Sequence, residues 1–412
     1  MKPDVVVIGS GPAGLMAALT AGKNGKKVTL LEALPSPGRK LLASGAGKCN
    51  FTNMLTAENM VEHFTAEQQR FIRPALLGFT PENARDFFVQ RGIKYTLVDD
   101  FYCFPASEKS SDILNCFLNE LNSLGVQIIC NSEVTDIEMA GDKVISVVCG
   151  NKKYCCDYLI AAGGGTGFPQ LGGGGSLDRI MQHKNIAFTA RTPALCALKS
   201  SDQWLKDLAG IVLDNVFLSL DRQYFSFGTL LFTGEGVSGP AALDLAGRIS
   251  RQIAGGQGHN VTVRANWKNR RTADEWLNIL NKARRENGKR LIHNVLAGEL
   301  PQAVINAIIE HINLKEVAIC NLSRSDTVIL LEYLTACPLN IYATENWQKA
   351  MASTGGIERR AIDSKTMQSR QISNLYFAGE FIDVDGPCGG YNIQWALSSG
   401  YLAGLLKSKK LK

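Results

Sequence analysis

The sequence predicts an α/β protein whose first domain is split in two by an inserted β-rich domain with a helical subdomain. Three observations lead to this fold class. Residues 4–32 read as strand, helix and strand, segments from about residue 191 alternate like antiparallel strands, and a buried strand at 375–378 resumes the first pattern. At 412 residues, of which 45% are hydrophobic, the chain is long enough for two or three domains.

The opening segment is one βαβ unit. Residues 4–8 are a short β-branched run, residues 12–23 carry helical spacing, and residues 27–32 return to a strand. The following stretch, 34–53, is rich in Gly, Ser, Pro and Lys and is too long for an ordinary connection, so it is a candidate functional loop.

A glycine-rich loop joins the first strand to the helix with the spacing GxGxxG. Gly9 permits the tight turn, Gly11 lets the backbone approach a pyrophosphate, and Gly14 allows the helix to pack against the strand. The helix N-terminus offers unpaired N–H groups to phosphate. Glu32, at the end of the second strand, is placed to accept hydrogen bonds from ribose hydroxyls. The predicted dinucleotide site also includes Ser10, Pro12, Ala13 and Ala33.

The remaining elements complete the split arrangement. Helices are predicted at 80–91 and 107–124, and a buried strand at 158–162 breaks into glycines 163–165. Shorter strands are predicted at 126–130, 133–139, 143–149, 211–220 and 224–232. We place the split domain at 1–190 and 353–412, the insertion at 191–352, and its helical part at about 268–336.

Composition excludes several classes of protein. The net charge of +6 is mild for this length and calls for neither nucleic acid nor membrane. No apolar run reaches about 18 residues and no signal-peptide pattern opens the chain, so we expect a cytoplasmic protein. The eleven cysteines form no CxxC pair and the five histidines are scattered, so we expect reduced thiols, no metal site and no hydrolase triad.

The carboxyl-terminal segment indicates FAD rather than a nicotinamide dinucleotide. The strand at 375–378 runs into Gly379, Glu380 and Asp383, and this placement offers Asp383 to a ribityl chain. A helix then begins at Gly390 and Tyr391, and its positive end suits the flavin N1 and O2 atoms, where negative charge collects on reduction.

Several long motifs carry a resemblance to a known family. They are residues 38–45, 47–53, 230–233 with 238–241, and above all 366–404. With these motifs the chain resembles bacterial flavoproteins described as NAD(FAD)-utilising dehydrogenases, related to aminoacetone oxidases and bile-acid enone reductases. The resemblance implies a Rossmann-type, glutathione-reductase-like FAD domain, with the isoalloxazine ring in a cleft beside the insertion.

The resemblance also implies cofactor contacts by position. It assigns to FAD the residues Arg39, Lys40, Leu41, Ser44, Gly45, Lys48, Cys49 and Asn50; the Val134 backbone at the adenine; Ala162, Gly163 and Gly164 at the pyrophosphate; and Gly379, Glu380, Asp383, Gly390, Tyr391, Asn392 and Ile393 at the flavin end. Lys40 and Lys48 are alternatively solvated surface charges, and Asn50 alternatively caps a turn.

The activity implied is an FAD-dependent redox reaction on a small molecule. Hydride would pass from NAD(P)H, visiting the same cleft, through flavin N5 to an activated C=C such as a steroid-like enone. Tyr391, Tyr102 and Cys388 are the candidate proton donors, although each also suits packing. The alternative within this class is oxidation of an amine such as aminoacetone by O2.

Other classes stay open. A non-catalytic redox partner is one, and an RNA-modifying flavoprotein is another, because the insertion carries basic residues. These are Arg270, Arg271, Arg284, Arg285, Lys289 and Arg290. Aromatic residues are not interleaved with these charges as a stacking surface would require, so we interpret them as a solvated face and expect no nucleic-acid partner. The chain departs from the family pattern at 171–177, 193–198 and Gly234, so the substrate stays open. The sequence does not determine the oligomeric state.

Overall fold

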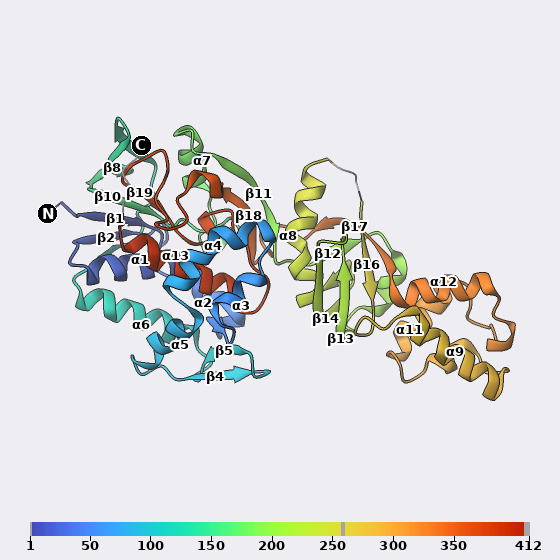
Figure 1. The fold of residues 1–412 in the computed structure, drawn as a ribbon. Helices are drawn as coiled ribbons and strands as arrows, with labels where there is room; N and C mark the ends of the chain where they lie inside the picture. Colours follow the sequence, from blue (N-terminus) through green and yellow to red (C-terminus); the bar gives the residue numbers. More distant parts are fainter. Residues whose placement is uncertain (1, 257–259, 408–412) are drawn as a thin grey trace. The chain divides into compact units, whose positions relative to one another are not determined.

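The structure is a computed structural model that describes residues 2–256 and 260–407 (Figure 1). Backbone contacts divide the chain into two compact units. Unit 1 comprises the described parts of Met1–Thr192 and Ala352–Lys412, and unit 2 is Pro193–Met351. The second unit is therefore an insertion into the first.

A five-stranded parallel sheet forms the centre of unit 1. Its strand order is β19-β10-β1-β2-β6, and every neighbouring pair is parallel. The strands are β1 (Val5–Ile8), β2 (Val28–Leu31), β6 (Gln127–Ile129), β10 (Tyr158–Ala161) and β19 (Leu375–Phe377). The four residues of β1 and of β2 are all buried, as expected of strands covered on both faces. Because the strands are parallel, their carboxyl ends meet at one edge.

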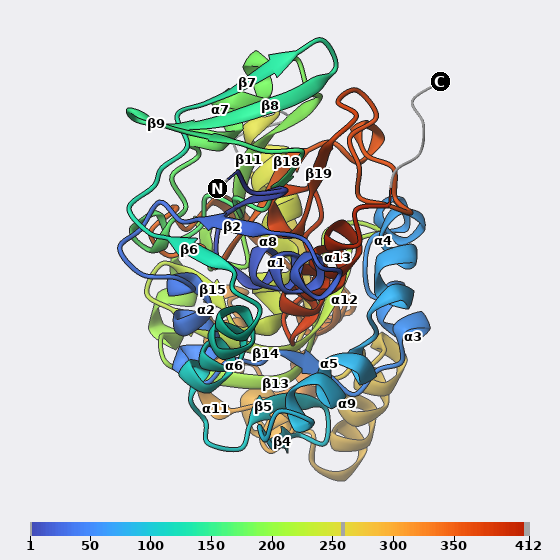
Figure 2. The same cartoon turned by 90° about the vertical axis from the view of Figure 1, so that its left-hand side faces the viewer.

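Two helices from opposite ends of the chain pack together over this sheet. Helix α1 (Pro12–Lys23) lies beside α13 (Tyr391–Gly404), as Figure 2 shows. Small residues allow this approach, because a Cβ at Gly400 would lie 2.3 Å from the Ala13 carbonyl oxygen. A Cβ at Gly404 would lie 2.5 Å from the Ala17 carbonyl oxygen. The contact packs the C-terminal part of α13 against the first turns of α1.

Smaller elements of unit 1 surround this core. The helices are α2 (Arg39–Ala43), α3 (Ala57–Glu62), α4 (Ala66–Gly78), α5 (Pro81–Val89), α6 (Ser110–Ser123) and α7 (Ser176–His183). One antiparallel sheet has the order β3 (Thr52–Asn53), β5 (Tyr102–Pro105), β4 (Tyr95–Val98), and another has β7 (Asp136–Ala140), β8 (Lys143–Cys149), β9 (Lys152–Cys155). Strand β11 (Phe188–Ala194) pairs with β18 (Ala352–Ile357).

Unit 2 is a closed six-stranded barrel with helices attached. The barrel order is β12 (Leu198–Ser200), β15 (Gly236–Ser238), β14 (Phe225–Thr233), β13 (Val212–Ser219), β16 (Val261–Asn266) and β17 (Cys337–Thr344). The helices are α8 (Pro240–Ala254), α9 (Ala273–Asn287), α10 (Ile292–Leu296), α11 (Gln302–His311) and α12 (Arg324–Thr335). Helix α8 packs along β14, and α9 to α12 fall within the stretch predicted to be helical (Figure 1).

The predicted fold class, an α/β domain split by a β-rich insertion, is confirmed. Helices α4 and α8 were not expected from the pattern. Pro74 inside α4 weakens its helical signal, and α8 follows Gly239 at φ +85°. No helix among residues 2–256 and 260–407 is both long and apolar enough to cross a membrane.

Candidate functional site

The predicted site residues gather at the carboxyl edge of the parallel sheet. Gly9 follows β1, Glu32 follows β2, Ala162 follows β10, and Gly379 lies two residues beyond the end of β19. Ligands of open α/β sheets bind outside this edge, where the strand order reverses. The topology thus brings together residues that are up to 370 positions apart in the sequence.

The three glycines of the first loop have different surroundings. Gly9 has φ +93°, and a Cβ there would lie 2.4 Å from the Ala162 carbonyl oxygen. A Cβ at Gly14 would lie 1.8 Å from the Gly9 carbonyl oxygen. A Cβ at Gly11, by contrast, would meet no atom within 4 Å. Gly9 and Gly14 are therefore required by packing, whereas Gly11 keeps a space open in front of the helix.

The N-terminus of α1 faces this space with unpaired donors. Gly11 is the N-cap, Pro12 occupies the first helical position, and no side chain caps the helix. Among the described residues, the N–H groups of Gly11, Ala13 and Gly14 donate to no acceptor. Such a helix end attracts an anion through its free N–H groups and its dipole, so it suits a pyrophosphate.

Glu32 is held beside the loop by hydrogen bonds. Its Oε2 accepts from the Ser10 N–H at 2.9 Å and from the Ser10 hydroxyl, and its Oε1 accepts from the Leu34 N–H at 2.9 Å. The Ser10 hydroxyl in turn accepts from the Gly38 N–H at 3.2 Å. These contacts fix the carboxylate at the end of β2, while Ala33 beside it is exposed.

The peptide groups around Val134 offer a second set of free polar atoms. The Val134 side chain is buried, yet its backbone N–H and C=O make no hydrogen bond within the described chain. Nearby backbone donors are engaged, since the Ser132 N–H donates to Glu32 O and the Thr135 N–H to Val148 O. Buried backbone groups are nearly always paired, so this position suits a heteroaromatic ring with a donor and an acceptor.

Lys40 and Glu380 connect the loop after β2 to the loop after β19. Lys40 Nζ lies 2.9 Å from Glu380 Oε2, and Glu380 Oε1 accepts from the Ser353 N–H at 2.8 Å. Burial raises the pKa of the Glu380 carboxyl, but Lys40 and the Ser353 N–H outweigh it, and the pKa lies below its usual range. Lys48, by contrast, pairs at 3.0 Å with Glu108, and both are about half exposed.

The segment 39–49 folds back on itself through left-handed residues. Gly45, Ala46 and Cys49 all have positive φ. The Ser44 hydroxyl donates to the Leu41 carbonyl oxygen at 2.6 Å, and the side chains of Leu41 and Cys49 are buried. Burial raises the pKa of the Cys49 thiol to about 12, so this thiol stays protonated. Arg39 begins α2 and has no acidic or hydrogen-bonding partner in the part of the chain that the structure describes.

Strand β3 holds the carboxyl-terminal loop in place. Thr52 Oγ1 donates to Gln394 Oε1 at 2.7 Å, and Asn53 Nδ2 donates to the Gly389 carbonyl oxygen at 3.0 Å. In the orientation that satisfies its neighbours, the Asn50 amide oxygen accepts from the Gly390 N–H at 3.2 Å. The loop is therefore anchored by polar contacts to residues more than 330 positions earlier.

The anchored loop leads into the N-terminus of α13. Gly390 is the N-cap at φ +86°, and no side chain caps the helix. The N–H groups of Asn392 and Ile393 find no acceptor among residues 2–256 and 260–407. The Asn392 side chain instead accepts from the Gly386 N–H and donates to the Gly386 carbonyl oxygen, which closes the preceding loop. This second free helix end suits the electron-rich edge of a flavin.

A family model that covers nearly the whole chain identifies the family. A model described as HI0933-like protein Rossmann domain matches residues 3–406. The chain belongs to the HI0933-like family. Its members bind FAD through a Rossmann fold, and the free helix ends, the open space at Gly11 and the unpaired Val134 backbone fit that cofactor.

Relatives named as enzymes match over nearly the whole chain. The chain is 30% identical to the Haemophilus influenzae protein named ribosomal RNA dihydrouridine synthase, covering 98% of each. It is 28% identical to the Escherichia coli protein of the same name, covering 97% of this chain and 96% of the relative. It is also 28% identical to the Clostridium scindens 3-dehydro-bile acid delta(4,6)-reductase, covering 97% of each.

One solved structure shares the fold at full length. The 3-ketosteroid delta1-dehydrogenase of Sterolibacterium denitrificans matches with a TM-score of 0.53 at 11% identity, covering 98% of this chain and 99% of that one. The likeness concerns the fold alone. The family and its named relatives identify this HI0933-like protein as an FAD-dependent oxidoreductase.

Asp383 has partners within the HI0933-like domain itself. Its Oδ1 accepts from the Gly355 N–H at 2.9 Å, and Oδ2 lies 3.5 Å from Arg359 Nη1. Asp383 is only 5% exposed, and its hydrogen bond to Gly355 ties β18 to the loop after β19. Contact between Asp383 and the ribityl chain stays a prediction.

The three candidate proton donors surround Gly389. A Cβ at this glycine would lie 2.8 Å from Tyr102 Cε1 and 3.4 Å from Tyr391 Cε2, and Cys388 is the preceding residue. The Tyr391 ring is buried and lies 5.3 Å from the ring of His63. Burial lowers the pKa of His63, with a smaller opposing effect of Glu62. The structure therefore adds a titratable group that sequence spacing could not connect with Tyr391.

Sequence reasoning also missed a buried ion pair below the glycines that follow β10. Arg191 Nε and Nη2 lie 2.6 Å and 3.0 Å from the two Asp178 carboxylate oxygens. The same guanidinium donates to the carbonyl oxygens of Gly164 at 3.3 Å and Glu380 at 3.1 Å. Since the Arg191 side chain is 4% exposed, the pair fixes two loops of the FAD site from beneath.

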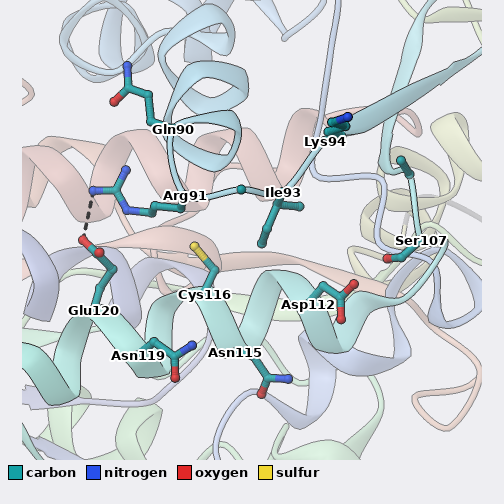
Figure 3. A pocket seen from close by; sticks show the side chains of 12 residues that line it. Gln90, Arg91, Ile93, Lys94, Ser107, Asp112, Asn115, Cys116, Asn119 and Glu120 are labelled. Carbon is teal, nitrogen blue, oxygen red and sulfur yellow. Dashed lines mark hydrogen bonds and ion pairs between the residues drawn. The ribbon is translucent and has the colours of Figure 1, made fainter.

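A separate groove of about 690 Å³ lies elsewhere on unit 1 (Figure 3). It is lined by the segment after α5 and by one face of α6, where Arg91 pairs with Glu120 at 2.9 Å. None of the predicted cofactor residues lines it. No group of metal-ligating side chains is found within residues 2–256 and 260–407.

One expectation about the insertion is wrong. Aromatic side chains do accompany its basic residues, because the Arg270 guanidinium lies 4.0 Å from the ring centroid of Phe217 and 5.2 Å from that of Phe225. Phe217 and Phe225 precede Arg270 by more than 40 positions. Only the pairing of β13 with β14 and β16 brings them together, so proximity in sequence gave no sign of it.

Proposed function

We propose that this HI0933-like protein reduces the C5=C6 bond of a uracil in ribosomal RNA, which yields dihydrouridine. The observation that carries the proposal is the match, at 30% and 28% identity over nearly the full length, to two proteins named ribosomal RNA dihydrouridine synthase. Each match covers at least 96% of both chains. The expected absence of a nucleic-acid partner, which rested on the pattern of charges, is set aside in this proposal.

The chemistry agrees with the reaction class expected from the sequence. The uracil C5=C6 bond is conjugated to the C4 carbonyl, as the double bond of an enone is conjugated to its ketone. Reduction adds one hydride and one proton, and NAD(P)H is the proposed donor, leaving NAD(P)⁺. Bound FAD would supply the hydride transfer.

The residues of the site have definite tasks in such a reaction. The N-terminus of α1 would hold the pyrophosphate of FAD, and the N-terminus of α13 would hold the flavin edge, each through its free N–H groups. The Tyr102 hydroxyl and the Cys388 thiol, beside Gly389, are the proposed sources of the proton. Tyr391 is packed against His63 and is better suited to a packing role beside Gly389.

A second candidate substrate is a 3-oxo steroid with conjugated double bonds. It is favoured by the 28% identity to the bile-acid reductase over 97% of both chains. The two candidates share the reaction and differ in the size and charge of the molecule that carries the double bond. They are separable by a direct competition.

The test uses the purified FAD-loaded protein under anaerobic conditions. Flavin bleaching by NADH or NADPH is followed first, and the reduced protein is then offered ribosomal RNA lacking dihydrouridine or a 3-oxo-Δ4 steroid. Nucleosides from the RNA are analysed by mass spectrometry for the gain of two hydrogens. Dihydrouridine that appears with RNA, and is absent with the flavin-free Gly11→Val variant, supports the proposal. Reoxidation by the steroid alone contradicts it in favour of the second candidate.

A further inference from the structure

Three phenylalanines lie on the outer face of two neighbouring barrel strands. Phe225 and Phe227 stand two positions apart on β14 and are 54% and 47% exposed, while Ser226 between them is 6% exposed. Phe217 on β13 lies directly opposite Phe227 in the strand register. Large aromatic side chains gathered on the solvent face of a sheet mark an interaction surface.

A cation covers part of this aromatic face. Arg270 lies 4.0 Å from the centroid of the Phe217 ring. Its sequence neighbours are neutralised inside unit 2, since Lys268 and Arg271 lie 2.8 Å and 2.6 Å from Glu299. Arg270 forms no ion pair within the described residues. The Arg270 guanidinium therefore lies against the phenyl rings, whereas Lys268 and Arg271 are paired with Glu299.

The backbone that presents Arg270 is strained. Asn269 and Arg270 have φ +44° and +56°, and Asn215 in the bulge of β13 has φ +60°. The Asn269 N–H donates to the Asn215 carbonyl oxygen at 2.8 Å, which ties the two strained turns together. Consecutive left-handed residues other than glycine are costly and tend to persist at functional positions. The hydrogen bond between Asn269 and Asn215 holds the loop from which the Arg270 side chain reaches the Phe217 ring.

We propose that this aromatic–arginine face, made by Phe217, Phe225, Phe227 and Arg270, binds single-stranded RNA. Bases would stack on the exposed phenyl rings, which accept any base, and the unpaired guanidinium would contact a phosphate. An apolar protein partner fits less well, because covering the face would bury Arg270 without an acceptor. The carboxylate nearest along β13, Asp214, accepts from Thr229 and lies beside the face rather than over the rings.

This inference rests on the proposed function, because it assigns a surface to the RNA substrate. The probe is a fluorescently labelled oligouridylate of about twelve nucleotides, a length in the range that single-stranded binding folds cover. Binding to the FAD-loaded protein is followed by fluorescence anisotropy at several salt concentrations. The variants are Phe225→Ala with Phe227→Ala, and Arg270→Ala. The matched controls are Tyr342→Ala, an aromatic residue 43% exposed on β17, and Arg285→Ala on α9.

The double phenylalanine variant is expected to weaken binding by about tenfold for each ring. Arg270→Ala should weaken binding and make the salt dependence shallower by about one phosphate contact. Both controls should bind within about twofold of the unmodified protein. Flavin content and melting temperature, measured on every variant, separate these effects from unfolding.

Two failures are distinguishable. If the unmodified protein forms dihydrouridine while the double variant binds oligouridylate equally well, this surface assignment is wrong and the proposed function stands. If the unmodified protein neither binds the oligonucleotide nor forms dihydrouridine, both are wrong. Binding that is lost equally in the controls would also overturn the assignment, since it would reflect general charge or apolar contact.

Discussion

Lys40 Nζ lies 2.9 Å from Glu380 Oε2, and this contact joins residues 340 positions apart at the carboxyl edge of the parallel sheet. Glu380 also accepts from the Ser353 N–H and hydroxyl, at 2.8 Å and 3.2 Å. The carboxylate therefore holds together the three segments on which the FAD-binding loops depend. Its charge is required for the ion pair with Lys40 and strengthens the hydrogen bonds from Ser353.

Replacing Lys40 should raise the pH below which the protein releases flavin and unfolds. The folded pKa of Glu380 lies below its ordinary value of 4.5, so the stabilisation is present above that value and is lost as the pH falls through the folded pKa. In Lys40→Met the folded pKa rises, because burial is no longer opposed by Lys40. We expect flavin release and melting to begin at a higher pH, measured by flavin fluorescence and thermal denaturation during acid titration.

The matched control is Lys48→Met, which removes a cation of the same segment. Lys48 and Glu108 are about half exposed, and such pairs contribute roughly 0–1 kcal/mol. The acid midpoint should stay where it is in the unmodified protein. Equal shifts in the two variants would contradict the assigned role of Glu380.

Substitutions at two glycines of the first loop should affect different properties, FAD binding at Gly11 and fold stability at Gly14. Gly11→Val places its side chain in open space, so the apoprotein should melt near the temperature of the unmodified apoprotein but retain little FAD. Gly14→Ala drives a Cβ to 1.8 Å from the Gly9 carbonyl oxygen, so the fold itself should be destabilised. Flavin absorbance and melting curves on the same samples check both outcomes. A Gly11→Val protein that retains stoichiometric flavin would refute the placing of the pyrophosphate.

Breaking the buried pair of Arg191 and Asp178 should be costly. Removing one partner of a buried ion pair leaves a charge unpaired and typically costs about 3–5 kcal/mol. We expect Asp178→Ala to lose stability on that scale, as measured by urea denaturation. Adding Arg191→Met should recover part of the loss, because it removes the stranded charge. The exposed pair of Lys282 and Glu286 is the control, and Glu286→Ala there should change stability by less than about 1 kcal/mol.

Local patterns predicted the part of the site that local geometry determines. The strand, loop and helix over residues 5–23 and the acid at Glu32 follow from spacing alone, because each lies within one βαβ unit. The contact of Thr52 with Gln394 joins residues 342 positions apart through a two-residue strand too short to carry a period. The same reason hid the stack of Arg270 on Phe217, which depends on the register of three barrel strands.

The cysteines should divide sharply by reactivity. Cys49 is fully buried within the FAD-binding segment, and burial raises the pKa of its thiol to about 12, so almost no thiolate forms at neutral or mildly alkaline pH. Cys155 and Cys320 are exposed. Iodoacetamide at about pH 8 should therefore modify Cys155 and Cys320 in the folded protein and reach Cys49 only in denaturant, as read by peptide mass spectrometry. Rapid labelling of Cys49 in a folded protein that carries Cys155→Ser and Cys320→Ser would show that the segment 39–49 opens, and would contradict the burial of Cys49 on which this prediction rests.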